Sequence, residues 1–320
     1  MNLIALEEPD KSWEEFVSTH SGLIFHTSLW GKVLKEGYGC EMRYLILEEG
    51  GDWLLALPGM LVGNRFFRIL YSLIPYGGFI GQKEFIPEFS KLLEEKAKKE
   101  KIDRIKIIDL EIKNKEKLPD FECLESYRHI LELKEKTLDQ IWGDYKPNLK
   151  RTIKKALNSD LIFERIKDRK EVDDFYELYQ ASMKRNKTLA KYPIDLFYKI
   201  FDFLIPSSAD IFFVKYQSKP VAGIVMIYSE ETAYYFHGGS FTEYLPLRAN
   251  DLLFHHAIKI AKEKGKSCFD FLGSEKGLSS LIQFKDKWGT KRETLLAFQK
   301  DIGVIRPFLG KVALGFARTP

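Results

Sequence analysis

The sequence contains the same short pattern twice, with the same spacing in both copies. In each copy an apolar strand pattern ends in two glycines, a helix pattern follows, and a second apolar strand carries an aspartate. Asp109 lies 31 positions after Gly78, and Asp270 lies 31 positions after Gly239. The repeat predicts a duplicated strand–helix–strand unit, in which a cleft formed by two similar lobes is the expected place of function.

Each copy is preceded by the same order of elements. Two helix patterns come first, and three strand patterns that can pair as a meander follow them. This order is typical of the α/β class, with two tandem acetyltransferase-like (GNAT) domains whose mixed, mainly antiparallel sheets are flanked by helices. The expected domains are 1–140 and 141–320. The expected helices are one starting at Ser12 and those spanning 28–36, 170–184 and 193–204, and the expected strands span 42–47, 53–61, 67–73, 105–109, 210–216, 220–228, 232–237 and 268–271.

Composition describes an ordinary globular protein. The chain has 320 residues, which is enough for two domains of about 150 residues, and 45% of them are apolar. The cysteines Cys40, Cys123 and Cys268 are far apart and form no CxxC pair, so neither a disulfide framework nor a zinc site is expected. We expect no metal and no bound cofactor.

The sequence contains no recognisable signal for export or for membrane insertion. Its first residues are acidic, and no apolar run reaches the roughly 18 residues of a membrane span. A net charge of +4 is too small by itself to indicate nucleic acid. We expect a cytoplasmic protein, with contact to the inner face of the membrane left open. For the basic stretch 306–318, packing at a helix end is favoured over membrane contact.

The most specific string is Phe284-Lys285, which is followed after three residues by Gly289 and comes soon after the Asp-Phe-Leu-Gly strand end at 270–273. This string resembles the Fem family of aminoacyltransferases, whose members have two acetyltransferase-like domains and add amino acids from aminoacyl-tRNA to the peptide stem of cell-wall precursors. The chain lacks a long heptad insert, so it is similar to the members without a coiled-coil arm. Further segments carry the resemblance over nearly the whole chain: 25–32, 145–155, 183–185 and 234–250.

The resemblance implies roles for particular residues. Lys285 would lie beside the transferred acyl group and stabilise the carbonyl oxyanion, and Phe284 would form a flat wall for the donor. Lys32 and Arg185 would bind the diphosphate of the acceptor, for which a lysine and an arginine fork are suitable counter-charges. Trp30 belongs to the same segment as Lys32, although a core position is favoured for it. Without the resemblance, a core Phe284 and solvated charges would be the preferred interpretation.

Two further residues are weaker candidates. Asp109 could orient or deprotonate the acceptor amine, but a structural role is equally open to it and to Asp270. Tyr235 could line the acyl pocket, as could Tyr234 and Tyr244, although most aromatic side chains on strands are in the core. The histidines His237, His255 and His256 match no metal spacing.

A basic helix is expected near 149–157, with Pro147 in its first turn. At about 100° per residue its basic side chains fall within an arc of about 140°, and its apolar side chains lie outside that arc. The positive face could contact tRNA phosphates or an anionic membrane, and a plain solvated face is the alternative. The basic residues are Lys150, Arg151, Lys154 and Lys155, and the apolar ones are Leu149, Ile153 and Leu157.

The donor is the least certain part of this prediction. Binding of coenzyme A requires a glycine-rich turn into a helix, and the corresponding turn at 247–250 reads Leu-Arg-Ala-Asn. We therefore expect transfer of an amino acid from aminoacyl-tRNA to the amine of a nucleotide- or lipid-linked peptidoglycan precursor. The alternatives are an acyl-CoA-dependent N-acyltransferase that acts on an amino sugar or other envelope polysaccharide precursor, and a non-catalytic module that binds anionic envelope precursors or membranes.

Overall fold

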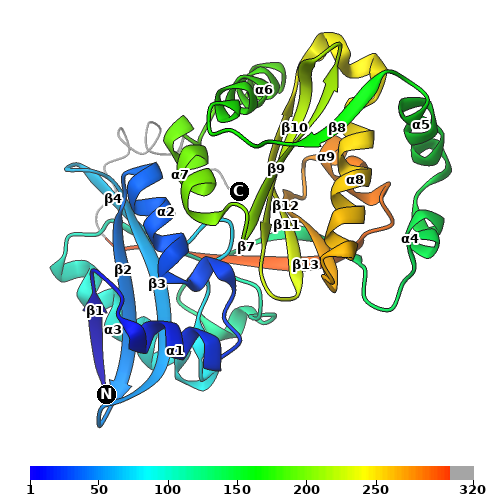
Figure 1. Ribbon diagram of the computed structural model, residues 1–320. Coiled ribbons are helices and arrows are strands. Elements are labelled where there is room, and N and C mark those ends of the chain that lie inside the picture. The colour runs from blue at the N-terminus through cyan, green and yellow to red at the C-terminus, as the bar shows by residue number, and fades with distance from the viewer. Residues whose placement is uncertain (303–320) are drawn as a thin grey trace. The chain divides into compact units, whose positions relative to one another are not determined.

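The computed structural model describes residues 1–302, which divide into two compact units (Figure 1). Unit 1 contains 1–126 together with the described residues from Thr294 onward, and unit 2 contains 127–293. The basic stretch 306–318 lies outside the described residues. No helix within residues 1–302 is long and apolar enough to cross a membrane.

Unit 1 is a sheet with the strand order β1-β2-β3-β4-β6-β13, and β5 pairs with β3. Neighbouring strands are antiparallel except for β4 and β6, which are parallel and are connected by α3. The elements are β1 (Asn2–Leu6), α1 (Lys11–Thr19), η1 (Ile24–His26), α2 (Ser28–Tyr38), β2 (Glu41–Glu49), β3 (Asp52–Asn64), β4 (Phe67–Ser72), β5 (Ile80–Gly81), η2 (Lys83–Phe85), α3 (Ile86–Lys99), β6 (Arg104–Asp109), η3 (Lys115–Lys117) and parts of β7 (Glu122–Glu132) and β13 (Lys291–Asp301).

Unit 2 repeats this plan with the strand order β8-β9-β10-β11-β12-β7. Its parallel pair is β11 and β12, which are connected by α8. The elements are α4 (Leu138–Asp144), α5 (Pro147–Leu157), β8 (Leu161–Arg165), α6 (Glu171–Arg185), α7 (Ile194–Leu204), β9 (Ala209–Tyr216), β10 (Lys219–Tyr228), β11 (Thr232–Ser240), η4 (Thr242–Leu247), α8 (Ala249–Glu263), β12 (Cys268–Glu275) and α9 (Ser279–Asp286).

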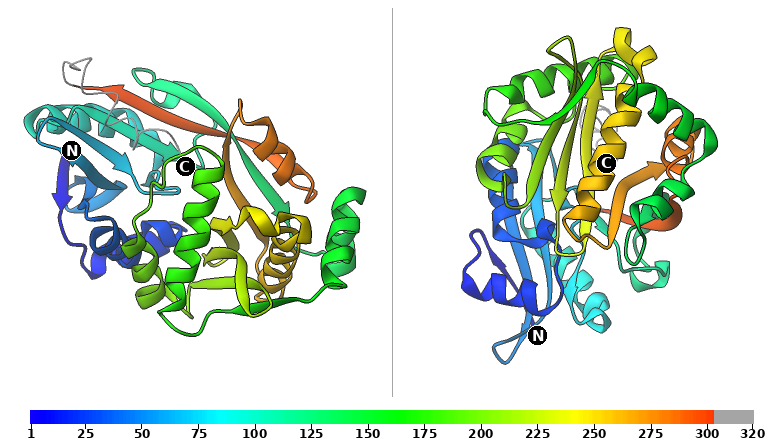
Figure 2. Two further views of the ribbon diagram at one scale, coloured as in Figure 1. Left: turned by 90° about the horizontal axis from the view of Figure 1, so that it is seen from above. Right: turned by 45° about the vertical axis from the view of Figure 1, so that its right-hand side comes forward.

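The predicted order of elements is confirmed in both units. Each has two helices, a three-stranded antiparallel meander, a crossover helix and a parallel strand. The apolar residues of α3 pack on one face of the unit 1 sheet, and those of α8 pack on one face of the unit 2 sheet, with α5 packed against α8 (Figure 2). The strands β1, β7, β8 and β13 are not predicted by the sequence patterns.

The division between the units differs from the boundary expected at 140/141. The segment 127–140 belongs to unit 2, and the chain returns to unit 1 at Thr294. Each sheet is completed by a strand from the other half of the chain: β13 pairs with β6, where Leu296 faces Asp109, and β7 pairs with β12. A single cut in the sequence cannot describe this exchange, which is why the expected boundary differs.

The second glycine of each repeat is required by close packing. A Cβ atom on Gly239 would collide with the backbone of Leu178 on α6. Gly78 has a φ of +45°, and a Cβ atom there would lie 2.6 Å from Asp109 Oδ2. The glycines therefore mark positions where another segment presses against the chain.

We expect Gly239→Ala to lower the free energy of unfolding by about 1–3 kcal/mol, because a backbone segment cannot move aside as a flexible side chain can. The matched control is Gly143→Ala on α4, where a Cβ atom would meet nothing within 4 Å. That change should be neutral or stabilising by up to about 1 kcal/mol, because alanine is the better helix former. Chemical denaturation of both variants gives the measurement, and equal stabilities would contradict the packing argument.

Candidate functional site

The two aspartates of the repeat form the same local structure. Asp109 and Asp270 are both buried, and Oδ1 of each accepts a hydrogen bond of 2.7 Å from the backbone N–H two residues further along the chain. The second oxygen of each faces a cation: Lys83 Nζ lies 3.8 Å from Asp109, and Arg128 Nε donates to Asp270 at 2.7 Å. The duplication therefore extends to the turn that each aspartate makes, whereas the cations come from different elements, η2 and β7.

The carboxylate of Asp109 accepts several hydrogen bonds from the protein backbone. Besides the bond described above, it accepts hydrogen bonds from the backbone N–H groups of Phe79 at 2.7 Å and Ile112 at 3.0 Å. These bonds tie the end of β6 to the segment that follows the first glycine pair. The geometry favours a structural role for Asp109, and its role as a base stays a prediction.

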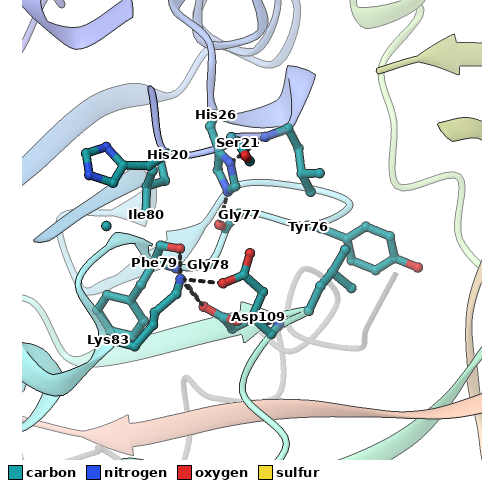
Figure 3. Close-up of a pocket in the computed structure, with 15 residues that line it drawn as sticks. His20, Ser21, His26, Tyr76, Gly77, Gly78, Phe79, Ile80, Lys83 and Asp109 are labelled. Atoms are coloured by element: carbon teal, nitrogen blue, oxygen red, sulfur yellow. Dashed lines mark hydrogen bonds and ion pairs between the residues drawn. The ribbon is translucent and has the colours of Figure 1, made fainter. Parts of the chain in front are cut away.

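A pocket of about 260 Å³ lies in unit 1 beside Asp109 (Figure 3). Its walls are the segments 20–23, 76–81 and 109–111, together with His26 and Lys83. Lys83 donates to Phe79 O and lies 3.3 Å from Glu111 Oε2. One ammonium group thus faces two carboxylates, so the charges of the pocket suit an amine better than a phosphate.

His26 is a pocket residue that sequence reasoning missed. Its Nδ1 accepts from Leu23 N–H at 2.9 Å, so Nε2 carries the proton and donates to Gly77 O at 2.7 Å. Burial lowers the pKa of His26 to about 4, so the ring is neutral near pH 7. The histidine lies inside the resembling segment 25–32, but its burial has no sequence signal.

Lys285 is a buried lysine whose side chain reaches β12. It lies on α9, its side chain is 2% exposed, and its Nζ donates to Gly273 O at 2.6 Å and to Leu272 O at 3.0 Å. Burial lowers the pKa of Lys285 to about 7, and the charge of Asp270 opposes this shift. Near neutral pH the group can therefore donate to a developing oxyanion when charged, or accept a proton when neutral.

Phe284 and Tyr235 are brought together in the core of unit 2. Both are partly buried, and both pack edge-on against Phe254, with ring centroids 5.2 Å and 4.7 Å from it. Burial raises the pKa of Tyr235, which therefore stays neutral. A role for either residue as a wall of an acyl site stays a prediction.

Arg185 holds the end of β11. From α6, its guanidinium donates to Ser240 O at 2.7 Å and to Ser182 Oγ at 3.0 Å. Burial lowers the pKa of Arg185. To bind a diphosphate as expected, the guanidinium would either keep these hydrogen bonds or exchange them for bonds to phosphate oxygens.

Lys32 and Trp30 have opposite environments on α2 in unit 1. The Lys32 side chain is 54% exposed and lies 4.0 Å from Glu36. Trp30 is completely buried, and its indole N–H donates to Ile74 O at 2.8 Å. The position of Trp30 favours the core role over contact with a substrate.

The basic helix is confirmed as α5, with one difference on its apolar face. Leu149 and Ile153 are buried, but Leu157 is 50% exposed and Ala156 is buried instead. The expectation for Leu157 was wrong because the buried side of the helix follows the spacing 149, 153 and 156, and Leu157 lies at the helix end. On the opposite side, Arg151, Lys154 and Lys155 are exposed, while Lys150 donates to Gly143 O at 2.6 Å.

Strand β7 adds two residues near Lys285 that the sequence patterns do not indicate. Arg128 pairs with Asp270, and His129 is completely buried with its Nδ1 3.3 Å from Asp286 Oδ1. Burial, together with the charge of Lys285, lowers the pKa of His129 to about 4. Within residues 1–302, no group of His, Cys, Asp and Glu side chains is arranged to hold a metal ion.

Comparisons with known proteins agree with this fold. Residues 143–285 match a family model described as an acetyltransferase (GNAT) domain. A search of curated protein sequences gave no match.

Among solved structures, a crystal structure of FemX has a TM-score of 0.71 and 17% identity, and the alignment covers 97% of this chain and 99% of the other. A tandem GNAT protein from the clavulanic acid biosynthesis pathway has a TM-score of 0.64 and 8% identity, with coverage of 95% and 99%. The C-terminal domain of a putative lysylphosphatidylglycerol synthetase from Agrobacterium fabrum has a TM-score of 0.60 and 14% identity, with coverage of 95% and 96%. These likenesses confirm the expected tandem GNAT fold. The match of 143–285 to the acetyltransferase (GNAT) domain model supports the expected enzyme class, an acyltransferase.

The buried charge of Lys285 predicts a specific pH dependence of stability. The folded pKa of about 7 lies below the ordinary value of 10.5, so between these values the unfolded chain binds more protons and stability rises with pH. Lys285→Met should therefore stabilise the protein below pH 7, by about 3–5 kcal/mol if the whole shift is relieved, and this advantage should shrink towards pH 10. Denaturation of both proteins across this range gives the difference.

Lys291→Met is the control for that experiment, because the Lys291 side chain is 70% exposed and avoids the cost of burial. Its stability relative to the unmodified protein should not change in this way with pH. A constant difference for Lys285→Met between pH 7 and 10 would contradict a buried, readily deprotonated Lys285.

Proposed function

We propose that this chain is an aminoacyltransferase that moves an amino acid from aminoacyl-tRNA to the amine of a nucleotide- or lipid-linked peptidoglycan precursor. The observation that carries the proposal is the buried Lys285 of the Phe-Lys string, held at the end of β12 with a pKa of about 7. It occurs in a chain whose fold matches that of FemX over nearly its whole length. The resemblance of the sequence to the Fem family supplies the donor and acceptor classes.

The proposed reaction is aminolysis of an ester. The acceptor nitrogen attacks the ester carbonyl, the N–C bond forms, the C–O bond to the terminal ribose of the tRNA breaks, and the proton lost by nitrogen ends on the leaving oxygen. The carbonyl oxygen becomes negatively charged on the way. A charged Lys285 would stabilise this oxyanion by a few kcal/mol, because a fixed ammonium in a site without water needs little reorganisation.

The acceptor is assigned to unit 1. Lys32 offers an exposed positive charge for the diphosphate, and the pocket beside Asp109 and Glu111 has charges that suit an amine. Arg185, in unit 2, is proposed as a phosphate ligand after exchange of its bonds at Ser240. Such substrates place the reaction in the cytoplasm, and a lipid-linked acceptor would bring it to the inner face of the membrane.

The proposed function and its alternative differ in the acyl donor. The donor is aminoacyl-tRNA in the proposal and acyl-CoA in the alternative, an N-acyltransferase that acts on an amino sugar. The matched family model favours the acyl-CoA alternative by its description. Against it, the turn that leads into α8 has no glycine, and the residue before the helix, Arg248, has a φ of +63°. A pyrophosphate site of the usual kind uses a glycine-rich turn at the N-terminus of the helix.

The direct test combines the protein with a set of aminoacyl-tRNAs and a nucleotide-linked pentapeptide, and measures the mass of the peptide. We expect an increase of one amino-acid residue. Lys285→Met should lower kcat about 100-fold with little change in KM, because the lost interaction is made mainly in the transition state. Lys291→Met should leave the rate unchanged. The absence of product with every tRNA, together with a thermal shift produced by coenzyme A, would contradict the proposal in favour of the alternative.

The role of Lys32 is tested on the same helix. Lys32→Met should raise KM for the acceptor about tenfold, because a contact between a charged side chain and a phosphate oxygen is lost. Lys35→Met is the matched control, since Lys35 also lies on α2, is 51% exposed and pairs with Glu8. Equal effects of the two substitutions would contradict a specific diphosphate contact by Lys32.

The exposed face of α5 is proposed to follow tRNA phosphates. Reversing Lys154 and Lys155 to glutamate should weaken tRNA binding and reduce the slope of log K against log salt concentration by about 1.4 to 1.8, since each lost phosphate contact contributes about 0.7 to 0.9. Equilibrium binding of uncharged tRNA at several salt concentrations measures this slope. Reversal of Lys96 and Lys98 on α3 in unit 1 is the control. A slope that is unchanged by the α5 variant would argue for a plain solvated face.

A further inference from the structure

Helix α9, which carries Phe284 and Lys285, depends on contacts with other elements for its position. It has eight residues, and its N-cap residue, Leu278, makes no side-chain capping bond. Isolated helices of this length are marginal in water, so tertiary contacts must hold α9 in place. Only Ile282 and Lys285 among its residues are buried. An apolar face of this size offers little stabilisation.

Consecutive side chains at the end of α9 are bound to different elements of unit 2. Lys285 reaches the carbonyls at the end of β12, and Lys287 donates to Asp251 on α8 at 2.5 Å. Trp288, just after the helix, is completely buried in the core. Asp286 faces β7 and the start of β13. The helix end is therefore held from several sides at once.

Asp286 is the centre of a small polar cluster. Its two oxygens accept from Arg292 in a bidentate pair, with Arg292 Nε 3.0 Å from Oδ1. His129 Nδ1 lies 3.3 Å from the same Oδ1, and the imidazole is completely buried. The hydrogen bond from Arg292 is the main cause that lowers the pKa of Asp286, so the carboxylate is charged near pH 7. Asp286 thus ties β13 to its own helix, and it lies beside the buried His129 of β7.

The contacts at the end of α9 oppose the tendency of the buried Lys285 ammonium to regain its hydration. A buried ammonium loses its hydration, and two carbonyl bonds and the charge of Asp270 on β12 return only part of it. On β7, Arg128 adds a second positive charge beside Asp270, and His129 is neutral. Lys285 would be hydrated if α9 moved away from the sheet, so a contact that resists this movement is needed.

We propose that Asp286 is the positioning residue for Lys285: through its bidentate pair with Arg292 on β13 it holds α9 against the sheet, so that Lys285 Nζ stays on the carbonyls of Leu272 and Gly273. The activity part of this inference rests on the proposed function. The geometric part does not, because the place of Lys285 can be observed without any substrate.

The test follows the ionisation of Lys285 directly. Lysine labelled with ¹³C at Cε gives an NMR titration for each lysine, and the Lys285 signal is the one that Lys285→Met removes. In the unmodified protein we expect a midpoint near 7. In Asp286→Asn the midpoint should rise by at least one unit, because the displaced ammonium regains water. Loss of the negative charge alone would move the midpoint downwards, so the sign separates the two effects.

The matched control is Asp202→Asn on α7, which removes a carboxylate held by an arginine, Arg169, elsewhere in unit 2. It should leave the Lys285 midpoint unchanged. In the transfer assay, Asp286→Asn should lower kcat at least tenfold with KM for the acceptor unchanged, and Asp286→Glu should recover part of the loss. If Asp286→Asn does not fold, Arg292→Gln removes the cation of the pair from a 43% exposed position and should raise the midpoint in the same way.

The outcomes are distinguishable. A folded Asp286→Asn or Arg292→Gln variant in which Lys285 titrates at its original midpoint, or lower, overturns the positioning role whatever the activity. If the unmodified protein transfers nothing but the midpoint rises in Asp286→Asn, the positioning of Lys285 stands and the proposed function fails.

Discussion

The burial of the Lys285 ammonium is the constraint on which the arrangement around α9 depends. An amine that is 2% exposed must be compensated, and the compensation comes from Leu272 O and Gly273 O, with the charge of Asp270 nearby. Asp270 is itself completely buried, which raises its pKa, and its ion pair with Arg128 on β7 opposes that shift. The chain of interactions therefore runs from α9 to β12 and on to β7, a strand that comes from the other half of the chain. The burial of Lys285 and the strand exchange are thus physically linked.

The two copies of the repeat have the same local structure at their aspartates but differ in the segments that pack beside them. Asp109 and Asp270 make the same turn with the backbone N–H two residues on. After β4, however, the chain folds back so that Gly78 N–H donates to Ile108 O and Phe79 N–H donates to Asp109, and these bonds fill the space beside β6. In the second copy β11 continues as a strand through Ser240. The first copy has become a pocket wall, and the second keeps an extended strand.

The sequence allows the repeated elements to be predicted because their signals are local. Alternating apolar residues mark the meanders, and the spacing of Gly239 and Asp270 marks the crossover. Strands β7 and β13 pair with distant partners and carry many charged residues, so no local pattern indicates them. The same holds for the site. Resemblance selects Lys285, but its burial and lowered pKa arise from tertiary contacts, among them those with Leu272 and Gly273. Its neighbour Asp286 lies beside His129, which is 157 positions away in the sequence.

The fold also separates two kinds of basic residue that look equivalent in the sequence. Lys154 and Lys155 are exposed at the end of α5 and keep ordinary hydration, which suits a long-range attraction for phosphates that salt can screen. Lys285 has lost its hydration, and burial lowers its pKa to about 7, so its protonation state changes near neutral pH. This suits a group that interacts with a charge only while that charge forms. Because an exposed lysine can bind a polyanion but discriminates poorly between ground state and transition state, binding and chemistry require different lysines. In unit 2 the difference is produced by burial alone, and burial of Lys285 depends on the contacts that hold α9.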